Sequence, residues 1–267
     1  MANQRRLGIF SWFGFVLPFQ KRLSLIKEAG FDATSIWWED EDTPWQTKKE
    51  HMPQLVKDMG LELDNLHVPY NNSNELWSER ESVRSNFIQR HIRWLNDCAN
   101  HHVPLMVMHL TEGLNPPAPN HYGLQSFYEL VKAAEELGVT IAIENTRRSD
   151  NLPYLLSAIP SSRLGYCYDS SHYFLSNKQD FDLLKNFGER LVATHLSDND
   201  GLEDRHWLPG HGIIDWTVLS RHFPATYQGG LTLEAYPTLE ERRKSPEAYL
   251  KNAWQKVRAT RDLFGNL

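Results

Sequence analysis

The sequence of 267 residues predicts one (β/α)8 barrel, a TIM barrel, over residues 1–267. A unit made of a short apolar or β-branched run, a polar loop and an amphipathic helical pattern recurs along the chain. Strands that alternate with helices form a parallel sheet, and eight such repeats close the sheet into a barrel. No Gly-x-Gly-x-x-Gly or Walker-type loop follows the first run, which argues against an open, doubly wound sheet.

The expected strands are apolar through most of their length, as strands covered on both faces of a parallel sheet are. Each has five or six residues, which suits a strand better than a helix. In chain order, the expected strands are Leu7–Trp12, Ala33–Trp38, Leu63–Val68, Leu105–Leu110, Thr140–Glu144, Leu164–Tyr168, Leu191–Leu196 and Leu231–Ala235.

The expected helices show apolar residues at the helical period and polar residues between them. Three of them end at a glycine, namely Gly30, Gly60 and Gly138, as a left-handed C-cap requires. In chain order, the expected helices are Phe19–Ala29, Thr47–Met59, Arg84–His101, Tyr122–Leu137, Leu152–Ala158, Phe181–Phe187, Trp216–Arg221 and Pro246–Phe264.

Composition limits the classes of function. The chain carries 34 acidic and 28 basic side chains, a net charge of −6, which disfavours a nucleic-acid partner because such proteins need a basic surface. No run of 18 apolar residues is present, so no membrane span is expected. Residues Met1–Arg6 are polar and lack the apolar region of a signal peptide, from which we expect a cytoplasmic protein.

Histidine and acidic residues occupy or closely follow the expected C-terminal ends of six strands, where barrels of this class carry their chemistry. A single histidine in such a place is more often structural, but a converging set of imidazoles and carboxylates suits Zn²⁺, Mn²⁺ or Fe²⁺. Calcium is disfavoured because it takes oxygen ligands. The expected metal ligands are His67, His109, Glu144, Asp169, His172, His195, Asp204, His206 and Glu234.

Four segments carry a resemblance to a known family. They are Ile143-Glu144-Asn145-Thr146, Asp169-Ser170-Ser171-His172, His195-Leu196-Ser197-Asp198 and the run from Leu208 to Trp216. With these segments the chain resembles the xylose-isomerase-like barrel superfamily over nearly its whole length. This superfamily contains sugar and sugar-phosphate isomerases and epimerases, and also the apurinic endonuclease IV family.

The resemblance implies a metal-dependent sugar or sugar-phosphate isomerase or epimerase. In the epimerase branch, the residues that match Glu144, Asp169, His195 and Glu234 bind one divalent metal, such as Mn²⁺ or Zn²⁺. Glu144 and Glu234 are then the expected catalytic pair. They would transfer a proton through a metal-stabilised enediolate.

The endonuclease branch offers an alternative. Asp204-Arg205-His206, His67 and His109 match ligand positions of its trinuclear zinc site, so one to three metals per chain are expected. A zinc phosphodiester hydrolase, a dehydratase or lyase on the same site, and a barrel that binds a sugar without catalysis therefore stay open. The acidic run from Glu39 to Asp42 and the scarcity of basic loops argue against a DNA substrate.

Aromatic and basic residues near the strand ends are candidates for substrate contact. Trp12, Phe13, Trp37 and Trp38, at the ends of the first two strands, are expected either to form an apolar wall against a sugar or to fill the barrel or cover its rim. Tyr70 is a further expected substrate contact. Arg205 is the expected clamp for a phosphate or carboxylate, and Arg147-Arg148 is a further candidate. Barrels of this type often pair, so a homodimer is compatible with the sequence.

Overall fold

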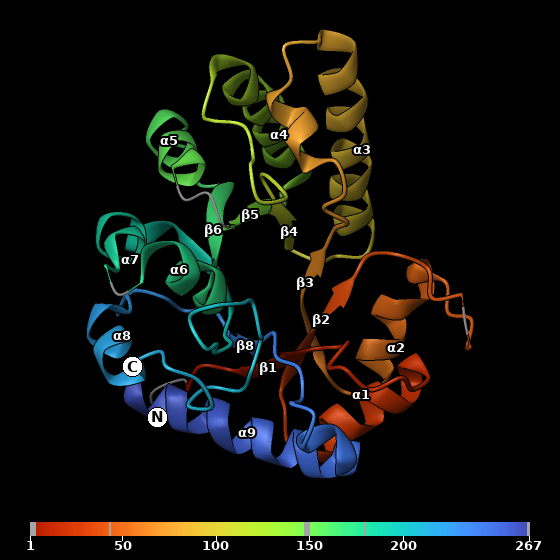
Figure 1. The fold of residues 1–267 in the computed structure, drawn as a ribbon. Helices are drawn as coiled ribbons and strands as arrows, with labels where there is room; N and C mark the ends of the chain where they lie inside the picture. Colours follow the sequence, from red (N-terminus) through yellow and green to blue (C-terminus); the bar gives the residue numbers. More distant parts are fainter. Residues whose placement is uncertain (1–3, 43, 147–149, 179, 266–267) are drawn as a thin grey trace.

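The computed structural model describes residues 4–42, 44–146, 150–178 and 180–265. Eight parallel strands form one sheet in the order β7-β6-β5-β4-β3-β2-β1-β8, and the expected TIM barrel is confirmed (Figure 1). The strands are β1 Leu7–Phe10, β2 Ala33–Trp37, β3 Glu62–His67, β4 Leu105–His109, β5 Thr140–Glu144, β6 Leu164–Asp169, β7 Leu191–His195 and β8 Leu231–Leu233.

The barrel is nearly closed between β7 and β8. One parallel bridge joins them, Leu196 to Leu233, with hydrogen bonds from the amide of Leu196 to Thr232 O at 2.8 Å and from the amide of Glu234 to Leu196 O at 3.3 Å. The seven other strand pairs have two to five paired positions each. The seam is therefore the weakest part of the barrel wall, and it runs directly beside His195.

Helices surround the sheet, and α9 and α1 lie side by side below β1 and β8 in Figure 1. Leu23, Leu95, Leu130, Leu155 and Val257 are among the buried residues that face the sheet from this layer. The helices are α1 Phe19–Glu28, α2 Met52–Asp58, α3 Glu81–Asn100, α4 His121–Leu137, α5 Asn151–Ala158, α6 Ser170–Asn177, α7 Asp182–Phe187, α8 Trp216–His222 and α9 Pro246–Leu263, with 3-10 turns at Lys49–His51, Ser73–Trp77, Gly188–Arg190 and Glu241–Arg243.

Helix α6 was not expected from the sequence. Its opening residues are polar and resemble a loop, but Asp169 at the end of β6 caps the helix by accepting a hydrogen bond from the amide of His172 at 2.7 Å. Strand β1 also ends at Phe10, two residues before the predicted end. Gly138 adopts the left-handed conformation that the C-cap of α4 requires, with φ of +70°.

The ends of the described chain lie together. The guanidinium of Arg5 is buried and donates hydrogen bonds to the carbonyls of Phe264 and Gly265, at 3.3 and 3.0 Å. Arg5 thereby joins the start of the described chain to the end of α9, which packs against β1 and lies below it in Figure 1. Within the described ranges, no helix combines the length and the apolar character that a membrane crossing needs.

Candidate metal centre and pocket

A layer of small side chains fills the barrel below the candidate site. Val107, Ala142, Cys167 and Ala193 form one buried cluster, contributed by β4, β5, β6 and β7. Side chains two positions apart in a strand share a face, so the next inward residue of each strand lies directly above this cluster. Those next residues are His109, Glu144, Asp169 and His195.

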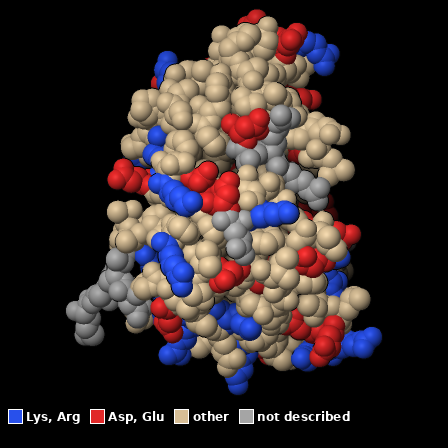
Figure 2. Space-filling model, turned by 60° about the vertical axis from the view of Figure 1, so that its left-hand side comes forward, with Lys and Arg blue, Asp and Glu red and all other residues tan. Residues whose placement is uncertain are grey.

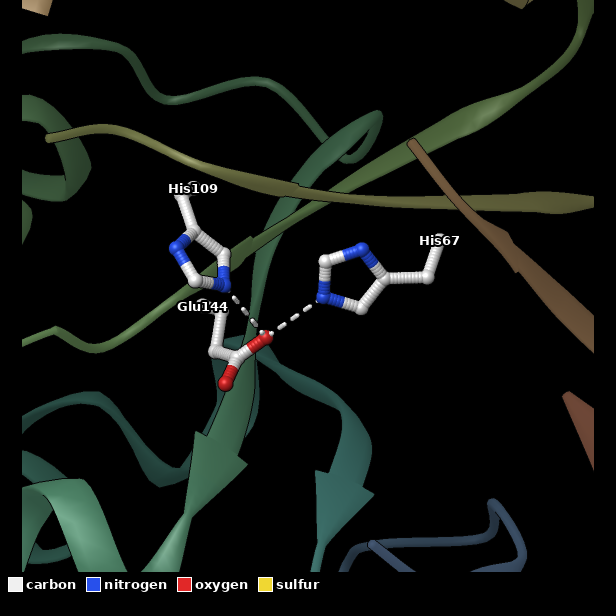
Figure 3. A group of neighbouring side chains, drawn as sticks. All are labelled: His67, His109 and Glu144. Atoms are coloured by element: carbon white, nitrogen blue, oxygen red, sulfur yellow. Dashed lines mark hydrogen bonds and ion pairs between the residues drawn. The ribbon is translucent and has the colours of Figure 1, made fainter. Parts of the chain in front are cut away.

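Glu144 lies at the centre of the candidate site and contacts four histidines. Its Oε2 atom is 3.0 Å from Nε2 of His67 and 3.3 Å from Nε2 of His109, as Figure 3 shows. The same oxygen is 3.2 Å from Nδ1 of His195, and Oε1 is 3.2 Å from Nδ1 of His172. A single buried carboxylate thus joins side chains from β3, β4, β7 and α6.

One group of four ligand atoms comes from Glu144, Asp169, His195 and Glu234, with all four atoms within 4.8 Å of one another. Glu144 Oε1, Asp169 Oδ2 and both ring nitrogens of His195 are buried without a hydrogen-bond partner. Buried polar atoms are almost always satisfied, so orphaned atoms in one cluster indicate a missing partner. One imidazole and three carboxylates suit Mn²⁺, Zn²⁺ or Fe²⁺, and the residues fit a divalent metal.

Two further ligand groups adjoin the first. His67, His109 and Glu144 form one, and Asp169, His172 and His206 form the other, each within 4.8 Å. Asp204 extends the latter, because its Oδ2 atom is 2.8 Å from Nε2 of His172 and 3.2 Å from Nε2 of His206. The groups share Glu144 and Asp169, so the structure brings all nine expected ligand residues into one continuous cluster.

The histidines are oriented by backbone carbonyls. Nδ1 of His67 donates to Val68 O at 3.0 Å, and Nδ1 of His206 donates to Glu234 O at 2.9 Å. A carbonyl only accepts, so each of these rings carries its proton on Nδ1 and turns Nε2 toward a carboxylate. Two acceptors then face each other unless a proton or a cation lies between them. This pattern is typical of histidines that bind metals.

Polar contacts fix the loops that carry the ligands. The side-chain amide of Asn145 donates to Asp169 O, and its Oδ1 accepts from the amide of Asp169, both at 2.9 Å. After β7, the buried carboxylate of Asp198 accepts from the amides of Gly210 and Ile214 and from the indole of Trp216. These bonds hold the loop that carries Asp204 and His206.

The carboxylates of the first group differ in their titration. Burial raises the pKa of Glu144, but the charges of His195 and His109 outweigh burial and hold that pKa well below its usual value. Burial of Glu234 is likewise outweighed by His195, and the pKa falls to about 2. Burial raises the pKa of Asp169 to about 6. Glu144 and Glu234 are therefore ionised at neutral pH.

Three of the histidines respond in the opposite sense, whereas burial lowers the pKa of His109. Burial lowers the pKa of His206, but its hydrogen bond to Asp204 and the charge of Glu234 outweigh burial and raise the pKa to about 9. Burial is outweighed by neighbouring acidic groups at His172 and His195 as well, and both pKa values lie well above the usual value. Without a cation, the cluster holds protons at neutral pH.

A pocket of about 650 Å³ opens above the cluster. Trp12, Trp37 and Tyr70 line it, whereas Phe13 and Trp38 are buried and are not among its lining residues. Tyr70 stacks on His109 with ring centroids 4.4 Å apart, and Trp37 lies 5.0 Å from His67. The aromatic wall is thus continuous with the candidate ligands.

Arg205 lies away from this pocket. Its guanidinium pairs with Asp200 and Glu203, both at 2.8 Å, and it is not among the residues that line the pocket. Arg147 and Arg148 lie outside the described residues.

Other lining residues were not identified from the sequence. Glu41 belongs to the acidic run after β2, and Thr111 and Glu112 follow His109 in the loop after β4. Their positions near strand ends could have suggested them as site residues. Nothing in the sequence, however, indicates that their side chains point into the pocket. The remaining unexpected lining residues are Phe10, Gly113, Leu114, Thr146 and Tyr236.

Comparison with known proteins agrees with this architecture. Residues 23–253 match the family described as Xylose isomerase-like TIM barrel. Protein y4fM of Sinorhizobium fredii is 28% identical over 247 residues, 79% of each chain. Fructoselysine 3-epimerase of Escherichia coli O157:H7 is 24% identical over 144 residues, about half (51%) of each chain.

Solved structures share the fold. D-psicose 3-epimerase of Clostridium cellulolyticum H10, determined with D-tagatose, superposes with a TM-score of 0.78 at 15% identity, covering 97% of this chain and 99% of that one. An L-ribulose 3-epimerase structure gives a TM-score of 0.77 at 15% identity, covering 98% and 95%. At this identity the similarity concerns the fold alone.

Proposed function

The chain belongs to the xylose isomerase-like TIM barrel family, and on that premise we propose that it is a metal-dependent sugar isomerase or epimerase. The observation that carries the proposal is the ligand group Glu144, Asp169, His195 and Glu234 beneath a pocket with an aromatic wall. The named epimerases among its relatives and structural neighbours support the same reaction class.

The proposed metal is held by the side chains of those four residues. Their orphaned buried atoms and mixed nitrogen and oxygen donors favour Mn²⁺ or Zn²⁺. When bound, a divalent ion would supply the Lewis acidity that makes the C–H next to a sugar carbonyl acidic.

Glu144 and Glu234 are the proposed proton carriers. They come from β5 and from the end of β8, both are ionised at neutral pH, and both line the pocket. Each contacts Nδ1 of His195, at 3.2 and 2.9 Å respectively. One carboxylate removes the proton from the sugar carbon. If the other returns a proton to the same carbon from the opposite side, the centre is inverted, whereas return to the adjacent carbon exchanges aldose and ketose.

The aromatic wall positions the sugar and keeps water from the reacting carbon. Trp12, Trp37 and Tyr70 present ring surfaces that pack on the C–H face of a sugar, while its hydroxyls meet the carboxylates below. His67 and His109 both contact Oε2 of Glu144 and so fix that carboxylate.

A second candidate, a zinc phosphodiester hydrolase, is favoured by the two additional ligand groups. Charge argues against nucleic acid as its substrate. On the face shown in Figure 2, basic and acidic groups are interspersed, without a continuous basic area. Such an area is what a duplex would need.

Metal content and isotope exchange test the proposal. Elemental analysis of protein purified without chelators is expected to give about one Mn or Zn per chain for the isomerase, whereas a content near three zinc would favour the hydrolase. A ketose screen in D2O with added Mn²⁺ is expected to show deuterium entering at the carbon next to the carbonyl. Metal binding without exchange on any ketose would contradict the isomerase proposal.

A further inference from the structure

Glu112 lines the pocket from the loop after β4 and is held there by the loop after β3. The amide of Asn72 donates to its Oε1 atom at 2.7 Å. Asn74 pairs with its backbone in both directions, because its Oδ1 accepts from the amide of Glu112 at 3.1 Å and its Nδ2 donates to the carbonyl at 3.0 Å. The carboxylate is therefore positioned before any substrate arrives.

Among the described residues, the guanidinium of Arg90 interacts electrostatically with Glu112 but forms no ion pair with it. In the described part of the chain, no Lys or Arg lies within ion-pair distance of it. Glu41, the other carboxylate at the pocket entrance, differs in this respect, since it pairs with the buried guanidinium of Arg22. The guanidinium of Arg90 donates to Asn71 O at 2.8 Å and packs on the rings of Phe87 and Trp94 in its own helix.

The rest of the pocket also favours positive charge. Trp37 and Tyr70 line the pocket with aromatic rings, which attract cations, while the ring of Trp12 already lies against the guanidinium of Arg22. None of the described residues that line the pocket is a lysine or arginine. A phosphate at this entrance would meet the carboxylate of Glu112, which repels it, whereas the charge of Glu41 is balanced by Arg22.

The pocket has room for a group beyond the reacting end of the substrate. Its volume of about 650 Å³ lies well within the range of pockets that hold drug-sized ligands. The carboxylate of Glu144 marks the deep end, where the proposed reaction occurs. Glu112 marks the outer end, where the non-reacting part of the substrate would lie.

We propose that Glu112 determines specificity by binding an ammonium group on the non-reacting end of the sugar, and that the substrate is an amino sugar or amine conjugate rather than a sugar phosphate. This inference rests on the proposed isomerase or epimerase function. The ammonium donates to the carboxylate of Glu112 and packs against the aromatic wall.

Three matched probes test the inference, namely D-fructose, 6-amino-6-deoxy-D-fructose and D-fructose 6-phosphate. Calorimetric titration into the Mn²⁺-loaded protein at low ionic strength measures binding, and deuterium incorporation in D2O measures the reaction separately. The amine is expected to bind at least about fivefold more tightly than the neutral sugar, as a charge-assisted hydrogen bond allows. The phosphate is expected to bind more weakly than either.

Glu112→Gln is the decisive variant because glutamine still accepts the hydrogen bond of Asn72. It is expected to abolish the advantage of the amine, so that the amine binds no more tightly than D-fructose. Glu136→Gln, an exposed position at the end of α4, is the matched control and is expected to retain the advantage. The advantage of the amine should also decrease as salt is added.

The outcomes separate this inference from the function on which it rests. Deuterium exchange without preference for the amine refutes the role of Glu112 and leaves the isomerase proposal intact. Amine preference that depends on Glu112, without exchange, supports the inference and contradicts the isomerase. Preference for the phosphate overturns the inference, and its loss in Arg147→Ala/Arg148→Ala would assign recognition to those arginines. Failure of all three probes to bind also overturns it.

Discussion

Oε2 of Glu234 lies 2.9 Å from Nδ1 of His195, but the two atoms do not have hydrogen-bond geometry. A short contact that lacks hydrogen-bond geometry fits two ligands that point at a common cation. The two residues are therefore expected to respond differently to substitution. Proton transfer depends on Glu234, whereas metal binding depends on His195.

Glu234→Gln is expected to lower kcat by at least about a hundredfold, because loss of a positioned acid–base group costs that much. The amide retains a donor oxygen, so metal content should stay close to that of the wild type. His195→Ala should instead lose the metal. Elemental analysis and deuterium exchange on the same preparations check both expectations. Equal metal loss in the two variants would contradict the division of roles.

Metal affinity is expected to increase with pH. Without metal, the pKa of His195, the imidazole of the proposed metal site, lies well above the usual value, so this ring is protonated at neutral pH. A ligand must be deprotonated, so each proton displaced makes affinity rise about tenfold per pH unit below the apo pKa. Competition with a chromophoric chelator between pH 6 and 9 measures this, and a flat profile would refute it.

His91 on α3 should make folding stability depend on pH. It is buried, and burial lowers its pKa to about 3, while Nδ1 donates to Phe87 O at 3.0 Å. Below pH of about 6.5 the unfolded chain gains a proton that the folded chain does not, so stability is lost as pH falls from there toward 3.

His91→Gln removes this dependence. Between pH 7 and 5, the wild type is expected to lose about 1 to 2 kcal/mol more unfolding free energy than the variant. Urea unfolding of both proteins at the two pH values gives the difference. Parallel losses would show that His91 titrates normally in the folded protein.

Trp37→Ala is expected to raise KM about tenfold with little change in kcat, because it removes apolar contact with the substrate rather than a reacting group. The indole is held in place by a hydrogen bond to Glu39 at 2.6 Å and by Tyr70, whose ring lies 5.6 Å away. Trp45→Ala, an exposed tryptophan outside the pocket, is the control. Unchanged KM in Trp37→Ala would remove this side chain from the binding wall.

The positions of the strands were predictable from the sequence. So was the convergence of histidine and acidic residues at one end of the barrel. Once β5 and β7 are recognised as parallel neighbours of β6, the period of two places Glu144 and His195 on the inner side. This reasoning needs only local pattern and topology.

Long-range contacts were not predictable in the same way. Arg205 turns to Asp200 and Glu203, although its place beside Asp204 suggested a substrate contact. Glu112 reaches the pocket because Asn74, 38 residues earlier, pairs with its backbone. Such pairings depend on how two loops meet in space, which hydrophobic periodicity does not encode.

The seam between β7 and β8 gives the proposed metal a mechanical consequence. His195 ends one strand and Glu234 follows the other, and the single bridge from Leu196 to Leu233 lies between them. A cation held by both side chains would join β7 to β8 across the seam. Metal binding would therefore also close the barrel wall at this point. Removal of the ion would then loosen the structure first along this line, and amide exchange at Leu196 and Glu234 would accelerate ahead of the rest of the sheet.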